Sequence, residues 1–359
     1  MDPSGLLSIL AEHNTSKLLN ITPKQIDDLV STITGRITLG GVSIQRLIAW
    51  KSLYPEVEDT HRYRYEYDSR TCQVVIKCIA EPISSALGSF FIAKVEAVLR
   101  SHLGNKTFES VVQLAARKTT FTGFSGVYHP VTQKVPDAFY RVVGDAMPTV
   151  VCSTGWVDNI TDLYNDSKVW LLGTGSQTTA VIVLVLHEKK IRGPVPCNYE
   201  APDSPDERQL LMGISHQTLY HNLAADILDL HHRGELSEPL LGKFQASVHI
   251  MRRNAAGNDV DEAYGATVFP VLAAHDPQFF SLTLGDLLGQ RVFQLKNYNA
   301  GEKIQFPLAI LRNVITQQLQ QQAKLRSYSR AISIMKSMGF WKDRHTVVPQ
   351  GIKRKWLYS

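Results

Sequence analysis

The sequence predicts an α/β fold in which helices flank a mixed β-sheet, and three observations support this prediction. Residues 180–186 are continuously apolar and rich in β-branched side chains, as expected of a strand that is buried on both faces. Over residues 83–103, apolar side chains recur every three or four positions, which is typical of an amphipathic helix. Strand-like and helix-like segments alternate along the centre of the chain, and this alternation indicates an α/β core.

The composition suits a folded globular protein. The chain has 359 residues, of which 44% are hydrophobic and 20% are charged, so it can bury a sizeable core in one large domain or two smaller ones. Lys and Arg number 38 against 33 Asp and Glu. The resulting net charge of +5 is compatible with a polyanionic partner without being diagnostic of one.

The cysteines and the apolar runs bear on location. Four cysteines occur without CxxC spacing in mainly apolar or strand-like surroundings, so we expect buried free thiols and an intracellular compartment, cytoplasmic or nuclear. The first residues have no basic stretch, and the apolar residues after them are interrupted, so no secretory signal is expected. No apolar run reaches the roughly 18 residues of a membrane span, so no membrane partner is expected.

Residues 1–55 are predicted to form a separable helical segment. Thr22 is a candidate N-cap, Pro23 suits the first helical position and Gln25 suits the capping box. Apolar residues follow at helical spacing up to Ile33, and the Gly40-Gly41 pair then interrupts the chain.

Residues 56–322 are predicted to form the main domain. It begins with a hairpin, in which strands at 62–67 and 72–79 are joined by turn residues at 68–71. The segments expected next are the helix at 83–103, an apolar segment at 108–116, strands at 135–142 and 148–156, a helix at 159–172 and a strand at 179–186. After a Pro-rich loop insertion near 187–213, we expect a helix at 219–231, strands at 246–251 and 267–273, and a helix at 307–322.

Residues 323–359 are predicted to form a basic C-terminal tail that includes a helix. Its Lys and Arg residues are interleaved with aromatic side chains, a pattern that suits contact with a nucleic-acid backbone and its bases. A helix that docks its apolar face while its lysines stay solvated explains the same pattern, and this second interpretation is favoured.

The order of several short motifs resembles one nuclease family. The motifs are an Arg- and Tyr-rich hairpin strand ending in Asp-Ser at 62–69, Pro-Asp-Ala at 136–138, a Pro-Thr-apolar strand at 148–156 and Leu-x-x-Asp-x-x-x-Trp at 163–170. Together they resemble a fungal branch of the PD-(D/E)XK nuclease-like superfamily over roughly residues 60–320. The resemblance implies a restriction-endonuclease-like fold, in which the Pro-Asp carboxylate and a carboxylate on the neighbouring strand hold Mg²⁺ beside a Lys that orients water.

The chain departs from that pattern at the proposed metal site. Asp137 matches the first carboxylate and is the candidate metal ligand, but Ser153 falls where the resemblance implies a Glu and Gly155 where it implies a Lys. A neutral hydroxyl is a poor ligand for Mg²⁺, so we expect Mg²⁺ to bind weakly and no other cofactor to be present. Asp158, just after the second strand, and Glu96, on the preceding helix, are the acids that would have to substitute.

The candidate catalytic residues are therefore Asp137, Ser153, Asp158 and Glu96, and three functions remain open. The favoured one is a catalytically degenerate nuclease-like protein that binds DNA, RNA or a protein partner. The second is an active Mg²⁺-dependent nuclease, a hydrolase of phosphodiesters with a displaced second carboxylate. The third is a non-enzymatic accessory or scaffold protein. Asp137 also has a structural interpretation, since an Asp at the entrance of a strand often hydrogen-bonds the local backbone.

Overall fold

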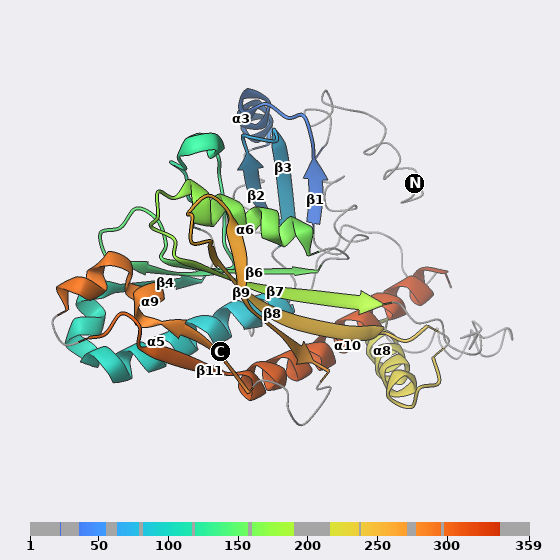
Figure 1. Ribbon diagram of the computed structural model, residues 1–359. Coiled ribbons are helices and arrows are strands. Elements are labelled where there is room, and N and C mark those ends of the chain that lie inside the picture. The colour runs from blue at the N-terminus through green and yellow to red at the C-terminus, as the bar shows by residue number, and fades with distance from the viewer. Residues whose placement is uncertain are drawn as a thin grey trace, which may run out of the picture. The chain divides into compact units, whose positions relative to one another are not determined.

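The computed structural model describes residues 22, 36–54, 63–78, 82–116, 119–156, 160–189, 216–236, 238–270, 278–295 and 298–337 (Figure 1). The chain divides into two compact units. Unit 1 comprises Met1–Glu188 and Phe244–Gln318, and unit 2 comprises Lys189–Lys243 and Leu319–Ser359. The segment predicted as a loop insertion thus begins a unit of its own, whose residues 190–215 lie outside the described part of the chain.

The first half of unit 1 holds β1 (Arg36–Leu39), α3 (Ile44–Leu53), β2 (Tyr63–Asp68), β3 (Gln73–Cys78), α5 (Pro82–Val111), β4 (Val112–Ala116), the short 3-10 turn η2 (Gly126–Tyr128), β5 (Ala138–Val142), β6 (Val150–Trp156), α6 (Thr161–Gly173) and β7 (Ala180–Lys189). After α8 (His216–His232) in unit 2 come β8 (Lys243–Arg253), β9 (Val260–Phe269), β10 (Phe279–Thr283), α9 (Leu284–Leu288), η3 (Gly289–Gln294), β11 (Lys303–Pro307) and α10 (Leu308–Ser337). The last residue of β7 and the first of β8 belong to unit 2, and α10 continues from unit 1 into unit 2.

A six-stranded mixed sheet forms the core of unit 1, in the order β4-β5-β6-β7-β8-β9. Strand β5 runs antiparallel to β4 and β6, whereas β6 and β7 are parallel and are joined through α6, because parallel neighbours need a crossover connection. Helix α6 lies on one face of the sheet and α5 on the other (Figure 1). The predicted α/β class, a mixed sheet flanked by helices, is confirmed.

Aromatic packing and two close backbone approaches hold α5 and α6 on the sheet. On the α6 side, the ring of Trp170 contacts those of Phe121 and Phe124 at centroid distances of 5.5 and 5.4 Å. A Cβ atom at Gly155 would lie 3.1 Å from Leu163 of α6, so this strand position accepts little more than glycine. On the other side, a Cβ atom at Gly88 of α5 would lie 3.2 Å from the Asp137 carbonyl oxygen, so α5 is close to the entrance of β5.

The predicted hairpin is confirmed, but it belongs to a separate sheet. Strands β2 and β3 pair antiparallel, and β1 adds to β3 to give the order β1-β3-β2. Residues Arg36–Leu39, which were predicted to lie in a helical segment, are therefore extended. Helix α3 follows with Ser43 as its N-cap, and its Trp50 packs against Tyr65 of β2 at a ring distance of 5.4 Å, so residues 36–54 are part of this small core. The helix expected just after Thr22 lies outside the described residues.

Other boundaries also differ from the predictions. Helix α5 extends to Val111, with Gly104 at a φ of 71° where the helix is kinked. Strand β9 begins at Val260 rather than near 267, and α10 continues through the predicted domain boundary at 322 to Ser337. Among the cysteines, Cys152 is a buried free thiol as predicted, whereas Cys72 is exposed because it lies in the hairpin turn with φ near 50°.

Unit 2 is built on α8 and the C-terminal part of α10. Leu223 and Ile227 of α8 share a buried cluster with Ala331 and Met335 of α10. Two basic residues of the predicted tail form hydrogen bonds within this unit. The guanidinium group of Arg326 donates to the Leu240 carbonyl oxygen at 2.9 Å, and that of Arg330 donates to the Glu238 carbonyl oxygen at 2.8 Å. In the described part of the tail, these contacts belong to the docked helix; residues 338–359 lie outside that part.

No helix within the described ranges combines the length and the apolar character needed to cross a membrane.

Candidate functional site

Asp137 lies at the entrance of β5, beside the middle of β6. The register pairs Ala138 with Cys152, and the Asp137 N–H donates to the Cys152 carbonyl oxygen at 3.1 Å. The Asp137 carboxylate accepts a hydrogen bond from the Thr154 N–H, with Oδ2 and N 2.6 Å apart. These two bonds bracket Ser153, so the structure brings Asp137 and Ser153 together. Both residues are buried, with exposed fractions of 9% and 4%.

The hydrogen bond from Thr154 gives Asp137 a structural role. Hydrogen bonds from a backbone N–H to a carboxylate are short and strong because the acceptor is charged. Here such a bond joins the irregular segment before β5 to the central strand β6. The interpretation of Asp137 as a residue that hydrogen-bonds the backbone at a strand entrance therefore describes the observed contact.

Cys152 does not provide a reactive group at this site. It is fully buried, and burial, followed by the negative charge of Asp137, raises the pKa of its thiol far above the ordinary value. Because the thiolate is the nucleophilic and metal-binding form, Cys152 acts as a small apolar side chain on β6.

Glu96 is held elsewhere on α5. Its carboxylate binds Arg100 one turn further along the helix at 2.9 Å, and Arg100 also pairs with Glu109 at 3.3 Å. Gly88, the α5 residue next to Asp137, is eight residues before Glu96, which corresponds to about 12 Å along the helix axis at 1.5 Å per residue. The structure therefore does not bring Glu96 to Asp137. Asp158 lies outside the described residues.

The described part of the chain contains no group of three or more His, Cys, Asp and Glu side chains arranged to hold a metal ion. At the predicted site it offers one carboxylate, Asp137, and one neutral hydroxyl, Ser153. Mg²⁺ is a hard cation that is held by several oxygen ligands, usually with more than one carboxylate or with phosphate groups. The described residues at this site do not fit Mg²⁺.

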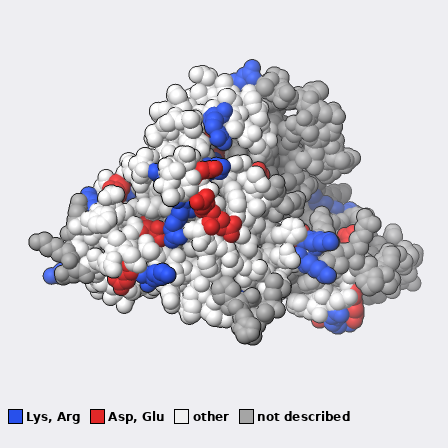
Figure 2. All heavy atoms as spheres, viewed as in Figure 1, with Lys and Arg blue, Asp and Glu red and all other residues white. Residues whose placement is uncertain are grey.

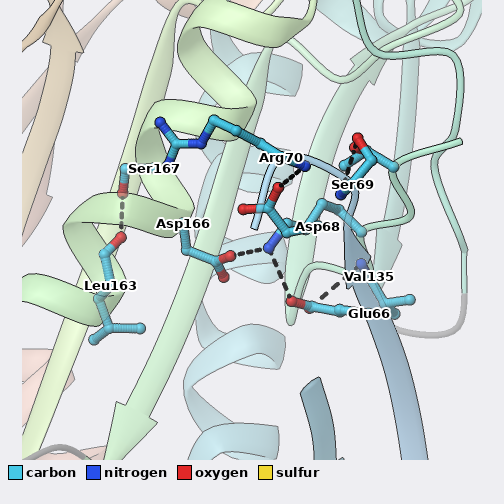
Figure 3. A network of polar contacts seen from close by, with 10 residues as sticks. Glu66, Asp68, Ser69, Arg70, Val135, Leu163, Asp166 and Ser167 are labelled. Carbon is cyan, nitrogen blue, oxygen red and sulfur yellow. Dashed lines mark hydrogen bonds and ion pairs between the residues drawn. The ribbon is translucent and has the colours of Figure 1, made fainter. Parts of the chain in front are cut away.

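A buried charge network, which the sequence interpretation did not find, lies on the α6 side of unit 1 (Figure 3). The Lys134 ammonium contacts Oδ1 of Asp166 on α6 and lies 3.4 Å from Oε2 of Glu66 on β2. The Val135 N–H donates to the other Glu66 oxygen at 3.4 Å. All three charged side chains are at least 95% buried. The network therefore ties the small sheet to the segment before β5 and to α6.

The charge state of Lys134 follows from its partners. Burial alone lowers the pKa of an amine, but the charges of Asp166 and Glu66 outweigh burial and raise the pKa of Lys134 above its usual value. The amine therefore stays protonated at neutral pH and cannot act as a general base. With its three members closed to solvent, the network is a structural element.

Glu66 and Asp166 lie in the motifs that carried the family resemblance, but nothing in those motifs links either residue to Lys134. Asp166 belongs to the Leu-x-x-Asp-x-x-x-Trp motif, and Asp68 and Ser69 end the hairpin motif. Asp68 accepts from the Arg70 N–H at 2.9 Å in the turn (Figure 3). The Ser69 hydroxyl donates to the Tyr128 carbonyl oxygen at 2.8 Å. Asp166 is only 5% exposed because Lys134 lies against it.

The hydroxyl of Tyr140, on β5, leads to a prediction about stability. This group is buried and has no hydrogen-bond partner among the described residues, and burial raises its pKa. An unpaired buried hydroxyl costs about 1–3 kcal/mol, so we expect Tyr140→Phe to increase the free energy of unfolding by about 1 kcal/mol. Urea denaturation followed by circular dichroism measures this change.

Tyr264→Phe is the matched control for Tyr140→Phe. The Tyr264 hydroxyl donates to the Phe279 carbonyl oxygen at 3.1 Å, so its removal is expected to decrease stability by about 1 kcal/mol. A decrease in stability for both variants would contradict the assignment of Tyr140 as unpaired.

Comparison of the chain with models of known protein families, with characterised proteins and with solved structures finds no match.

Proposed function

We propose that unit 1 carries a restriction-endonuclease-like core that has lost metal-dependent hydrolysis and serves to bind a protein partner. The observation that carries this proposal is the Asp137 carboxylate, which hydrogen-bonds the Thr154 backbone beside the neutral Ser153. An active nuclease of this class would need that carboxylate, together with a second one, to face a cation.

The arrangement of elements supports the nuclease-like class. Helix α5 precedes three neighbouring strands, β4, β5 and β6, and α6 then crosses over to the parallel strand β7. The Pro-Asp step lies at the entrance of β5, and the position that corresponds to the second carboxylate lies on the adjacent strand β6. This is the relation between two strands that the sequence resemblance implies.

The side chains at the three implied catalytic positions support the loss of hydrolysis. Asp137 is engaged with the backbone, Ser153 has no charge, and Gly155 has Leu163 only 3.1 Å from the place of its missing Cβ. A Lys at position 155 would therefore have to displace Leu163 from the α6 interface. The packing at this position suits glycine better than Lys.

The charged residues favour a protein over a nucleic acid as partner. Arg326 and Arg330 of the predicted basic tail are occupied by carbonyl oxygens within unit 2. On the face drawn in Figure 2, basic and acidic side chains lie next to each other rather than in areas of one sign. A surface that follows a phosphate backbone needs a continuous positive strip, whereas mixed charges are ordinary at protein interfaces.

Hydrolysis is tested with supercoiled plasmid DNA in Mg²⁺ and in Mn²⁺. We expect that neither the wild type nor Asp137→Ala converts the plasmid to nicked or linear forms, because one buried carboxylate does not assemble a metal site. Asp162→Ala, which removes an exposed acid on α6, is the matched control. Cleavage by the wild type and by Asp162→Ala that is lost in Asp137→Ala would refute the loss of hydrolysis.

The choice of partner is tested separately by DNA and RNA binding between 50 and 200 mM salt. Neutralised phosphates release counterions, so a nucleic-acid interface with 6–10 phosphate contacts would lose about 10³–10⁵-fold in affinity over this range. We expect no saturable binding at either salt concentration. Saturable binding with such a salt dependence would contradict the proposal of a protein partner. It would not affect the proposed loss of hydrolysis.

A further inference from the structure

Three polar side chains on β8 and β9 form a continuous hydrogen-bonded chain in unit 1. The Ser247 Oγ lies 2.8 Å from Nε2 of His249, and Nδ1 of the same ring lies 3.0 Å from Oε1 of Glu262. An ionised carboxylate only accepts hydrogen bonds, so Nδ1 carries a proton, and in the neutral imidazole Nε2 then accepts from the serine hydroxyl. The three groups are thus ordered as nucleophile, base and orienting acid.

The strand geometry explains how these residues meet. Ser247 and His249 are two positions apart on β8 and so project from the same face of the sheet. On β9, Gly265 is the register partner of His249, and a Cβ atom at Gly265 would lie 2.0 Å from Oε1 of Glu262. The glycine therefore leaves the space in which the Glu262 carboxylate reaches the imidazole ring.

Two irregularities in the β8–β9 ladder flank this group. The register shifts between Ala246 and Ser247 and again between Ile250 and Met251. Bulges of this kind re-aim side chains and are common beside functional sites. Here the second shift, which lies between His249 and Glu262 in the ladder, places Glu262 opposite Met251 and alongside the ring of His249.

The electrostatics keep the carboxylate ionised. Burial raises the pKa of Glu262, but hydrogen bonds from Tyr164 and from His249 outweigh it, and the pKa is lowered overall. The Tyr164 hydroxyl, on α6, donates to Oε2, while burial and this bond raise its own pKa and keep it protonated. The imidazole is 15% and the Glu262 side chain 37% exposed, and Ser247 is also partly exposed.

We propose that Ser247, His249 and Glu262 form a serine acyl-transfer site for small carboxylic esters. The Ser247 oxygen attacks the ester carbonyl carbon while its proton moves to Nε2 of His249, and Glu262 stabilises the imidazolium through Nδ1–H. The bond from the former carbonyl carbon to the alkoxy oxygen of the ester then breaks. The alkoxy group takes the proton from Nε2 and leaves as the alcohol. Water attacks the acyl-serine by the same route, giving the carboxylic acid and free Ser247.

This activity is separate from the function proposed above. It uses β8, β9 and α6, whereas the degenerate nuclease site lies at the junction of β5 and β6. Asp137→Ala is therefore expected to leave the acyl-transfer site unchanged. Failure of one proposal does not affect the other.

The test is covalent labelling of the full chain with an alkyl fluorophosphonate. Attack by Ser247 forms a P–O bond and expels fluoride, while the hydroxyl proton passes to His249. We expect one adduct, found at Ser247 by peptide mass spectrometry and absent in Ser247→Ala. A general base contributes about 10²–10⁴-fold, so His249→Gln is expected to slow labelling by about a hundredfold or more, and Glu262→Gln by about tenfold or more.

Gly265→Ala tests the geometry without altering any of the three residues. Its Cβ displaces the flexible end of Glu262, so we expect about tenfold slower labelling with little change in thermal stability. Gly40→Ala, with nothing within 4 Å of its Cβ, and Ser281→Ala, a partly exposed strand serine, are the matched controls and should label at the wild-type rate. Hydrolysis of p-nitrophenyl acetate provides a second readout and should follow the same order.

Two results would overturn the proposal. One is the absence of an adduct at Ser247 in wild-type protein whose circular dichroism shows it to be folded. The other is labelling at Ser247 whose rate is the same in His249→Gln and Glu262→Gln as in the wild type, because the serine would then react without a base.

Discussion

Replacing Lys134 with methionine is expected to lower the free energy of unfolding by about 3–5 kcal/mol, the usual cost of removing one partner from a buried ion pair. The methionine fills a similar volume but leaves Glu66 and Asp166 without the cation that lies between them. Two carboxylates that are at least 95% buried would then lose the ammonium group that lies between them. Urea denaturation followed by tryptophan fluorescence measures the loss, since Trp50 and Trp170 lie in the two cores that the network joins.

Two comparisons separate charge from packing in this prediction. The triple variant Glu66→Gln, Lys134→Met, Asp166→Asn removes all the charges, and we expect it to regain much of the lost stability. Lys168→Met breaks the more exposed pair with Asp259, in which the two charged groups lie 2.9 Å apart. This change should cost much less than Lys134→Met, because solvent screens exposed pairs. If Lys134→Met costs no more than Lys168→Met, the buried network does not stabilise the fold.

The pH dependence of the Lys134→Met effect follows from the raised pKa of Lys134. The stabilisation by a group whose pKa is raised on folding is fully present below the unfolded value, 10.5, and is lost as the pH rises through the higher folded value. The difference in stability between the wild type and Lys134→Met should therefore be the same at pH 7 and pH 9. It should decrease only above pH 10.5. If this difference in stability were smaller at pH 9 than at pH 7, the amine would not be held in its charged form.

Asp286→Ala is expected to cost about 2–4 kcal/mol, because one carboxylate serves two structures. It accepts from the Thr283 N–H at 2.7 Å in the capping box of α9. It also binds Arg252 of β8 through two bonds of 3.1 and 2.7 Å. Removing it therefore uncaps α9 and leaves a guanidinium group of the central sheet without its carboxylate. Urea denaturation measures the combined loss.

A double-mutant cycle divides the effect of Asp286 between its two roles. In the second bond of the capping box, the Asp286 N–H donates to Oγ1 of Thr283 at 3.0 Å. Thr283→Ala removes only this bond and should cost about 1 kcal/mol. Arg252→Met should cost less in the Asp286→Ala background than in the wild type, because the bidentate pair is already broken there. Additive costs for Arg252→Met and Asp286→Ala would show that the pair contributes nothing.

Local patterns were sufficient to predict most elements of the central sheet. The apolar run at 180–186 became β7, and the periodicity at 83–103 became the first part of α5. Strand β1 was missed because it has only four residues and is held by pairing with β3, whose residues are distant in the sequence. Such pairing leaves no signal in a short window of sequence.

The candidate site was predictable in part. The order of motifs indicated that Asp137 and Ser153 would be neighbours, and the contacts around Ser153 agree. The burial of Asp166 was not predictable, because its partner Lys134 lies 32 positions earlier in a segment without regular periodicity. The approach of Glu262 to His249 was not predictable either, because it depends on the register shift between Ile250 and Met251 and on the missing side chain of Gly265.

The sequence by itself determined the α/β class, the order of helices and strands in the central sheet and the absence of a second acid at position 153. These properties depend on turn residues, apolar periodicity and side-chain identity, all of which act within a few residues of the chain. Only the tertiary structure decided which charges meet, since it places Lys134 between Glu66 and Asp166 although no local pattern links the three residues. Contacts between distant segments depend on how whole elements pack, and that packing sets the free energy of every buried polar group.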